Sequence, residues 1–298
     1  MPQAHTLLAA TDFSAPARHA LERAAQLAQM HPDARMALVH VVSVSALDKL
    51  RRLLPGEAPA VEAELLAQAE RNLAELATNL ASRYKCHIDT ELIQGSAPTA
   101  LAGLADARQA DLLVMGARGA HFVRELLLGS TTEQVLRKSR RPLLAVKQRP
   151  QTPYRRILAA VDFSDHAAAA INAAHTWLPD ADIVLLHAFE VELESTFRLA
   201  GLSDDKIHEY RIQARENAQA AMDIFIGKLQ VPTRRLSRQF VHGSPTQCIL
   251  EHEQMLDADL IVMGKRGQSV MEELLLGSVT KHVLAHSSSD VLIAGSPV

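Results

Sequence analysis

The stretch VMGARGAHFVRELLLGSTTEQVL, residues 114–136, decides the fold, because it returns later as VMGKRGQSVMEELLLGSVTKHVL, residues 262–284. Between residues 115–130 and 263–278, ten of the sixteen positions are identical. In each copy an apolar run ends at a glycine, a second glycine follows three positions later, and a Gly-Ser pair follows after ten more. An irregular spacing that occurs twice indicates two copies of one domain.

Other segments recur in the same order at nearly the same offset. They are LLAATDFS (7–14) with ILAAVDFS (157–164), ALVHVV (37–42) with VLLHAF (184–189), and RPLLAVK (141–147) with SDVLIAG (289–295). We therefore predict two tandem domains, residues 1–149 and 150–298. The polar segment QRPQTPYRR, residues 148–156, is the predicted linker.

Short apolar runs alternate with helical patterns in each copy. In the first copy, the predicted strands are 6–10, 36–44, 87–93, 111–115 and 142–147, and the predicted helices are 15–30, 57–84, 98–108 and 131–139. The apolar runs are nearly uninterrupted, as is typical of strands covered on both faces. Strands separated by helices indicate parallel pairing. We predict the α/β class, with two five-stranded parallel sheets that carry helices on both faces. Ligands of such sheets bind outside the carboxyl ends of the strands.

Composition restricts the function classes. The 298 residues have a net charge of −3, which gives no reason to expect a nucleic-acid partner. Neither a signal-peptide pattern nor a run of roughly 18 apolar residues is found, so no membrane association is expected. The two cysteines, Cys86 and Cys248, are not at equivalent positions, which argues against a disulfide framework and favours a cytoplasmic protein.

The glycine-rich stretch is predicted to bind an anion. Gly116 and Gly264 end the fourth strand of each copy, where a side chain would keep the backbone from touching a ligand. Gly119 and Gly267 are predicted to allow a turn with positive φ. The spacing fits neither a phosphate-binding loop of the Walker type nor the dinucleotide fingerprint. The alternative is that these glycines only shape turns and cap a helix.

A helix begins directly after the last glycine. Gly129-Ser130 and Gly277-Ser278 precede it, and serine is a favoured N-cap. The free N–H groups and partial positive charge of a helix N-terminus suit a phosphate. Arg118 and Arg266, which lie between the first two glycines, are predicted to add a charge-assisted contact.

Polar residues mark the ends of the first strand and the interior of the second. Asp12 and Asp162 are predicted to accept hydrogen bonds from a nucleoside; the alternative is that the aspartate or the nearby serine caps the next helix, and both roles are compatible. His40 and His187, flanked by apolar residues, fit core histidines better than catalytic ones.

A metal site is not expected. His282 and His286 lie four apart on the last helix, a spacing that can hold a metal, but the first copy has Gln134 and Lys138 there. They are therefore weak candidates.

On these residues, the sequence resembles the universal stress protein family over essentially its whole length, as a tandem pair. The pattern Gly-x2-Gly-x9-Gly-Ser after an apolar strand, the early Asp-Phe-Ser and the histidine of the second strand carry the resemblance. It implies a Rossmann-like, ATP-binding fold with strand order 3-2-1-4-5. It implies nucleotide contacts in the first copy from Asp12, Val41, Gly116, Arg118, Gly119, Gly129, Ser130 and Thr131. The equivalents in the second copy are Asp162, Ala188, Gly264, Arg266, Gly267, Gly277, Ser278 and Val279.

The first copy departs from the family pattern in two places. Ala10-Thr11 precedes Asp12, and the proline of Gly-Ser-Ala-Pro, residues 95–98, is displaced by one position. The second copy is therefore expected to be the more regular site. The resemblance also implies dimers through the last strand, so we expect an intrachain pseudo-dimer and a homodimer.

The predicted function is binding of ATP, or a related adenine nucleotide with or without Mg²⁺, in stress response or regulation through ligand-dependent conformation or partners. The chain is expected not to be an enzyme, since no second acidic ligand with a recognisable spacing accompanies the single aspartate of each site. Slow ATP hydrolysis is compatible with this view. The alternatives are a weak ATPase or autophosphorylating protein, and a scaffold with one or both sites empty.

Overall fold

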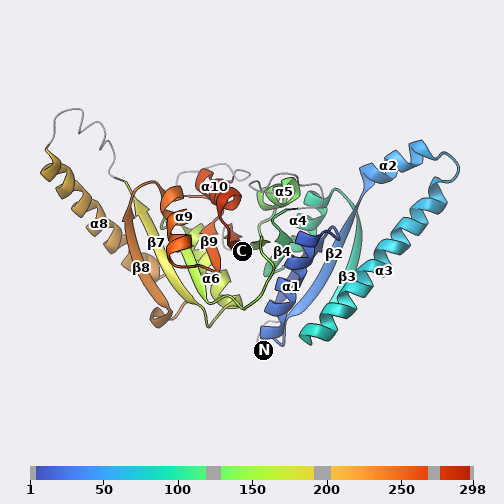
Figure 1. Cartoon of the computed structure of the whole chain (residues 1–298), viewed down its shortest axis with the longest axis horizontal. Helices are drawn as coiled ribbons and strands as arrows, with labels where there is room; N and C mark the ends of the chain where they lie inside the picture. The colour runs from blue at the N-terminus through green and yellow to red at the C-terminus, as the bar shows by residue number, and fades with distance from the viewer. Residues whose placement is uncertain (1–4, 119–128, 191–202, 268–275, 296–298) are drawn as a thin grey trace. The chain divides into compact units, whose positions relative to one another are not determined.

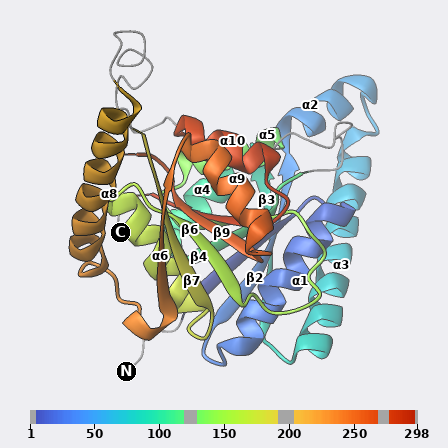
Figure 2. The same cartoon turned by 60° about the vertical axis from the view of Figure 1, so that its left-hand side comes forward.

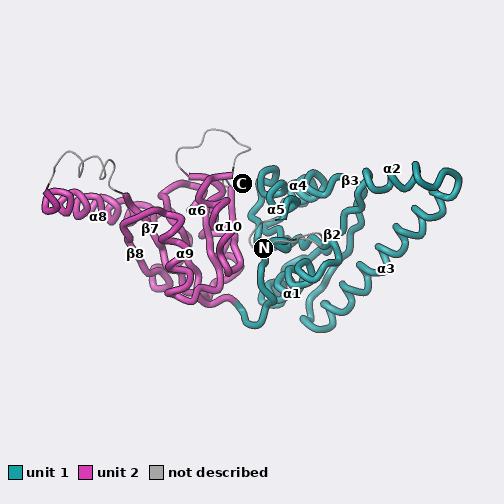
Figure 3. Tube along the Cα trace, turned by 45° about the horizontal axis from the view of Figure 1, so that its top comes forward, with its two compact units in different colours: residues 1–153, 298 teal, residues 154–297 magenta. Residues whose placement is uncertain are grey.

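A computed structural model describes residues 5–118, 129–190, 203–267 and 276–295 of the chain. The chain divides into two compact units, residues 1–153 and 154–297 (Figure 3). We refer to them as domain 1 and domain 2.

Domain 1 contains a five-stranded, entirely parallel sheet in the order β3-β2-β1-β4-β5 (Figure 1). The strands are β1 (Thr6–Thr11), β2 (Arg35–Ser43), β3 (Ile88–Gly95), β4 (Leu112–Gly116) and β5 (Leu143–Val146). The helices described are α1 (Ala15–Met30), α2 (Val44–Leu53), α3 (Ala58–Tyr84), α4 (Ala97–Ala107) and α5 (Ser130–Lys138). Helices α1 and α3 pack on each other and on the sheet, and α4 and α5 form a second pair on its other face (Figure 2).

Domain 2 repeats this arrangement with strand order β8-β7-β6-β9-β10, again entirely parallel. Its strands are β6 (Arg156–Ala160), β7 (Asp182–Phe189), β8 (Leu236–His242), β9 (Leu260–Gly264) and β10 (Asp290–Ala294). Its described helices are α6 (Asp165–Trp177), α8 (Asp204–Ile226), the short 3₁₀ helix η1 (Thr233–Arg235), α9 (Pro245–Met255) and α10 (Ser278–His286). The predicted fold class and the strand order 3-2-1-4-5 are therefore confirmed in both halves.

The central strands form the core because both of their faces are covered. Leu7, Leu8 and Ala9 of β1 are fully buried, and so are Leu112 and Leu113 of β4. Each such leucine side chain contributes about 1.5–3 kcal/mol of burial free energy relative to an exposed one. The carboxyl ends of β1 and β4 are thereby held side by side, since Leu7 pairs with Leu112 and Ala9 with Val114.

One helix of domain 1 was missing from the sequence prediction. Helix α2 starts directly after Ser43 at the end of β2, and Leu47 is its one buried residue. Leu47, Leu50 and Leu54 nevertheless recur at i, i+3 and i+7, so a helical signal was present in the segment and was overlooked. The predicted helices 98–108 and 131–139 begin one residue earlier, at Ala97 and Ser130.

Two further properties are read directly from the structure. Cys86 and Cys248 are both free thiols, and burial raises the pKa of each.

Among the helices of the described ranges, none has both the length and the apolar character needed to cross a membrane.

Candidate functional site

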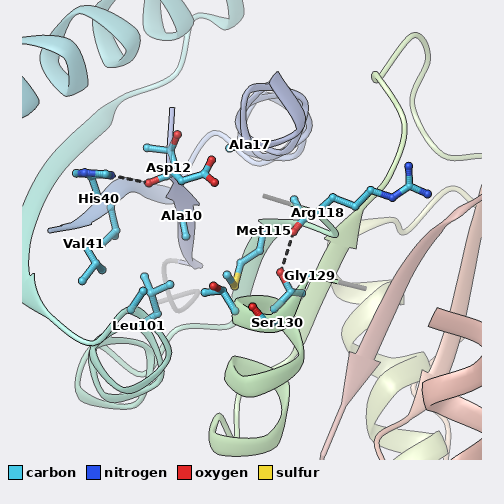
Figure 4. A pocket seen from close by; sticks show the side chains of 16 residues that line it. Ala10, Asp12, Ala17, His40, Val41, Leu101, Met115, Arg118, Gly129 and Ser130 are labelled. Carbon is cyan, nitrogen blue, oxygen red and sulfur yellow. Dashed lines mark hydrogen bonds between the residues drawn. The ribbon is translucent and has the colours of Figure 1, made fainter. Parts of the chain in front are cut away.

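A cavity of about 400 Å³ opens at the carboxyl ends of β1, β2 and β4 in domain 1 (Figure 4). The N-terminal turns of α4 and α5 close its other side. Of the predicted site residues, Asp12, Val41, Gly116, Arg118, Gly129, Ser130 and Thr131 line it. Gly119 lies outside the described residues.

Domain 2 has the corresponding cavity, with a volume of about 460 Å³. It lies at the ends of β6, β7 and β9 and is bounded by the first turns of α9 and α10. Its lining includes Asp162, Ala188, Gly264, Arg266, Gly267, Gly277, Ser278 and Val279. The fold thus brings together every described residue that was predicted for each site.

The aspartate after the first strand has a local role and also lines the cavity. Asp12 Oδ1 accepts a hydrogen bond from the Ser14 backbone N–H at 3.0 Å, and Asp162 Oδ1 accepts one from Ser164 N–H at the same distance. Ser164 Oγ donates a second bond to Asp162 Oδ1 at 2.6 Å. The helix N-cap is the serine, whose Oγ accepts from the backbone N–H three residues on. Both carboxylates are therefore held in place by their own turn.

The residue between aspartate and serine has an unusual backbone conformation. Phe13 and Phe163 both have φ 63°, in the left-handed region. An aromatic residue is rarely found there, and such a conformation costs on the order of 1–3 kcal/mol. The strained conformation occurs beside the cavity in both copies. We therefore interpret it as part of the turn that holds the aspartate at the cavity.

The histidine of the second strand braces the same turn. His40 Nδ1 donates to the Thr11 carbonyl oxygen at 2.8 Å, and His187 Nδ1 donates to that of Val161 at the same distance. A carbonyl oxygen can only accept, so the proton is on Nδ1. Each imidazole also contacts the ring of the preceding turn's phenylalanine, with centroids 4.3 Å apart. Burial lowers the pKa of His187, against the opposing effects of the Val161 hydrogen bond and the Asp162 charge.

The structure gives a further reason why the fourth strand must end in glycine. A Cβ on Gly116 would lie 3.0 Å from the Arg118 carbonyl oxygen and 3.1 Å from the Pro16 backbone. A Cβ on Gly264 would lie 3.0 Å from Ala167 N and from His166 Cβ. These neighbours belong to the protein itself. The glycine is therefore needed where the first helix packs on the strand end, and the role of the same glycine in ligand access stays a prediction.

The expectation for the second glycine is wrong where it can be checked. Gly267 does not have the predicted positive φ. A Cβ at this position would instead lie 3.1 Å from Asp162 Oδ2. The absence of a side chain therefore lets the carboxylate approach the loop that follows β9.

The last helix begins at the serine, so the glycine is the N-cap. Gly129 and Gly277 occupy that position, and Ser130 and Ser278 are the first helical residues. The predicted serine N-cap is wrong. Gly129 N–H donates to the Ala117 carbonyl at 2.8 Å, and Gly277 N–H donates to that of Lys265 at 3.0 Å. The next N–H groups of the helix are those that an α-helix leaves without an intrahelical partner, and they lie at the cavity.

Comparison with known proteins agrees with this geometry. The profile of the universal stress protein family matches residues 4–147 and again residues 153–295. The chain belongs to the universal stress protein family. The two matches cover nearly the whole chain, so it is a tandem universal stress protein.

Relatives of one-domain and two-domain length are found. Universal stress protein MJ0577 of Methanocaldococcus jannaschii is 29% identical over 152 residues, which cover 47% of this chain and 94% of that protein. A universal stress protein of Mycolicibacterium smegmatis is 22% identical over 298 residues, or 96% of both chains. A crystal structure of a universal stress protein from Archaeoglobus fulgidus covers 99% of this chain and all of that chain, with 20% identity and a TM-score of 0.70, which shows the same fold.

A threonine that the sequence analysis missed ties the helix to the strand in both sites of this universal stress protein. Thr132 Oγ1 donates to the Gly116 carbonyl oxygen at 2.8 Å, and Thr280 Oγ1 donates to that of Gly264 at 2.9 Å. Both threonines are buried. The signal was present, because the threonine is identical in the two copies three residues after the last glycine.

Apolar side chains that line the cavities were also missed. In domain 1 these include Ala10, Leu101 and Met115, and their counterparts in domain 2 are Ala160, Ile249 and Met263. Figure 4 shows Met115 between Ala10 and Ser130, and Leu101 near Val41. In the same view the Arg118 side chain extends away from Asp12 and Ser130. Such apolar residues are indistinguishable from core in a sequence, since they lie near strand ends and helix starts.

The candidate metal pair does not extend to a site among the described residues. His282 and His286 stack with ring centroids 4.0 Å apart, and His286 Nδ1 bonds to the His282 carbonyl. The described ranges contain no group of three or more histidine, cysteine, aspartate or glutamate side chains arranged to hold a metal.

Proposed function

We propose that this universal stress protein binds ATP, or a related adenine nucleotide, in both cavities and acts in stress response through nucleotide-dependent changes of conformation or partners. The supporting observation is that each cavity combines three kinds of group, each suited to one part of a nucleotide. The N-terminal turn of α5 or α10 suits phosphate. The carboxylate of Asp12 or Asp162 can accept hydrogen bonds from ribose hydroxyls. The apolar side chains suit a base.

The cavities fit such a ligand in size and shape. Their volumes of about 400 and 460 Å³ lie within the range of about 300–1,000 Å³ that is usual for small-molecule sites. Glycine at the N-cap leaves no side chain over the helix end. Mg²⁺ commonly binds through one or two carboxylates together with substrate phosphates. Asp12 or Asp162 is the carboxylate that each described cavity offers for it.

We propose further that the protein is not a fast catalyst. Phosphoryl transfer requires a group that positions the nucleophile, charge stabilisation and metal ligands. Among the described residues that line each cavity, one carries a carboxylate, one an imidazole and one a guanidinium group, and the Arg118 guanidinium extends away from Asp12 and Ser130. We expect ATP turnover far below the usual enzyme median of about 10 s⁻¹. A steady-state rate of phosphate release near that value would contradict this part of the proposal.

The binding proposal is tested best by placing a negative charge at the helix end. Ser130 and Ser278 are the first residues of α5 and α10, and both line their cavities. Glutamate there is favourable for the helix but repels an anionic ligand. We expect Ser130→Glu and Ser278→Glu to fold normally and each to lose ATP binding at its own cavity. The matched controls are Ser130→Gln and Ser278→Gln, which have the same size without the charge.

Calorimetric titration of ATP and native mass spectrometry measure the result. We expect two nucleotides per wild-type chain, one for each single glutamate variant and none for the double variant. Equal binding by the glutamate and glutamine variants would contradict the proposal. The scaffold alternative predicts instead that no nucleotide copurifies and that ATP leaves the melting temperature unchanged. The native mass also tests the predicted homodimer.

A further inference from the structure

The two cavities differ in polarity at the helix end. By position, Thr131 of domain 1 corresponds to Val279 of domain 2, and each is the second residue of its helix and lines its cavity. Threonine and valine have nearly the same shape, but only threonine carries a hydroxyl that can donate a hydrogen bond. The difference therefore changes the hydrogen-bonding capacity of the cavity wall but hardly changes the shape of the cavity.

A second pair differs in the same way but does not act on the cavity. Thr11 of domain 1 corresponds to Val161 of domain 2, and both also line the cavities. Thr11 Oγ1 accepts a hydrogen bond from the Phe13 backbone N–H at 3.0 Å, and the residue is 7% exposed. The Thr11 hydroxyl is therefore engaged by the backbone of its own turn. Of these two differences, the one at the exposed Thr131 is therefore the one that a ligand could meet.

Exposure to solvent increases along the start of helix α5. Gly129 is buried, whereas Ser130 and Thr131 are exposed. A phosphate chain that begins near the buried glycine and runs along the first turn would present its outer phosphates to Thr131. A nucleotide with one phosphate would end before that residue.

We infer that Thr131 makes the cavity of domain 1 discriminate in favour of nucleotides with a longer phosphate chain, whereas the cavity of domain 2 discriminates less. This inference rests on the proposed nucleotide binding. One hydrogen bond to a phosphate from a solvent-exposed hydroxyl is worth about a five- to tenfold change in affinity. The quantity to compare is the ratio of the dissociation constants of AMP and ATP within one cavity, because the contacts to base and ribose cancel in that ratio.

The structure provides a separate reporter for each cavity in the full chain. Met115 lines the cavity of domain 1 and Met263 that of domain 2, and they are 5% and 4% exposed. With ¹³C-methyl methionine, each methyl resonance follows the occupancy of its own cavity during a titration with ATP or AMP. Met115→Leu and Met263→Leu assign the two resonances with little disturbance, since the volume is conserved.

The test is a reciprocal exchange of the two isosteric residues. In the wild type we expect the AMP-to-ATP ratio at Met115 to exceed that at Met263 by about five- to tenfold. Thr131→Val should lower the first ratio to the level of domain 2, and Val279→Thr should raise the second. Equal ratios in the wild type, or ratios that the exchanges leave unchanged, would overturn the inference while nucleotide binding stands. If neither methyl resonance moves with any nucleotide, the proposed function itself is wrong, and the inference with it.

Discussion

The turns after β1 and β6 reach the same shape with different residues. In domain 1 the Thr11 hydroxyl accepts a hydrogen bond from the Phe13 N–H, and in domain 2 Val161 has no hydroxyl to offer. Phe13 and Phe163 nevertheless have the same φ of 63°. The bonds that both copies share are those from the serine N–H to the aspartate and from the histidine to the strand carbonyl. These shared bonds, rather than the threonine, therefore set the turn.

The loops that lead into α4 and α9 differ in backbone instead. In domain 1, β3 continues through Gly95, which pairs with Ser43 and has no positive φ. In domain 2, β8 ends at His242, and Gly243 follows with φ 139°. The displaced proline noted in the sequence accompanies this change, since it is the second residue of α4 but the first of α9. The backbone conformation therefore favours glycine at position 243, whereas it does not require glycine at the equivalent position 95.

The largest expected effect tests what the two domains share. Gly116→Ala and Gly264→Ala should each lower the free energy of unfolding by about 1–3 kcal/mol, because the added Cβ meets backbone or Cβ atoms at 3.0–3.1 Å. Urea denaturation measures the change. The control is Gly103→Ala within α4, where a Cβ meets nothing within 4 Å and stability should rise by up to about 1 kcal/mol. Comparable losses in all three variants would show that packing at the strand end is not the cause.

The next prediction tests where the domains differ. Gly243→Ala should cost about 1–2 kcal/mol, because its φ of 139° is one that residues with side chains rarely adopt. Gly95→Ala should stay within about 0.5 kcal/mol of the wild type, since its Cβ would lie 3.5 Å from Ala100 Cβ, an ordinary contact. Thermal unfolding of the two variants under one condition decides the matter. Equal losses would remove the backbone distinction between the two loops.

A smaller effect concerns pH and the histidine of domain 2. Burial lowers the pKa of His187 below its ordinary value of about 6.5, so the unfolded chain takes up a proton there more readily than the folded one. This contribution to stability is present in full above about pH 6.5 and is lost as the pH falls through the lowered folded pKa. His187→Asn keeps a donor toward the Val161 carbonyl but does not titrate. Denaturation midpoints at pH 8 and pH 5.5 should differ less in this variant, and an unchanged difference would disprove the assignment.

The smallest effect separates the two thiols. Burial raises the pKa of both cysteines, so both should react slowly with a disulfide reagent at neutral pH and faster as the pH rises. Cys248 is only 4% exposed, whereas Cys86 is half-buried. Cys86 should therefore react first. Cys248→Ser should remove the slow phase alone, and loss of the fast phase instead would reverse the assignment.

The sequence predicted the sheets because their signal is local and repeated. Apolar runs between helical patterns specify the strands, and segments copied in the same order at nearly the same offset specify the two domains. Every described residue predicted for the sites also lines its cavity, since parallel strands end at one edge of their sheet. Helix α2 was overlooked although Leu47, Leu50 and Leu54 recur at helical spacing in its short segment.

The roles of individual glycines could not be predicted, because they depend on neighbours distant in sequence. Gly116 faces Pro16, a hundred positions away, and Gly267 faces the carboxylate of Asp162. A glycine in a sequence indicates only that a side chain is unfavourable there. Whether the obstacle is a ligand, a helix or a backbone angle is decided by packing. The prediction of core histidines was only partly right: His40 and His187 are hydrogen-bonded to a strand carbonyl, but they are half-buried and line the cavities.

The turn that carries the strained phenylalanine has a consequence for ligand association. Since Asp12 and Asp162 are already fixed by their own turns, the entropy of ordering these carboxylates is lost when the chain folds. An arriving molecule does not have to organise them again, and more of its contact energy remains as affinity. The carboxylate of each cavity is thus preorganised for a ligand before the ligand arrives.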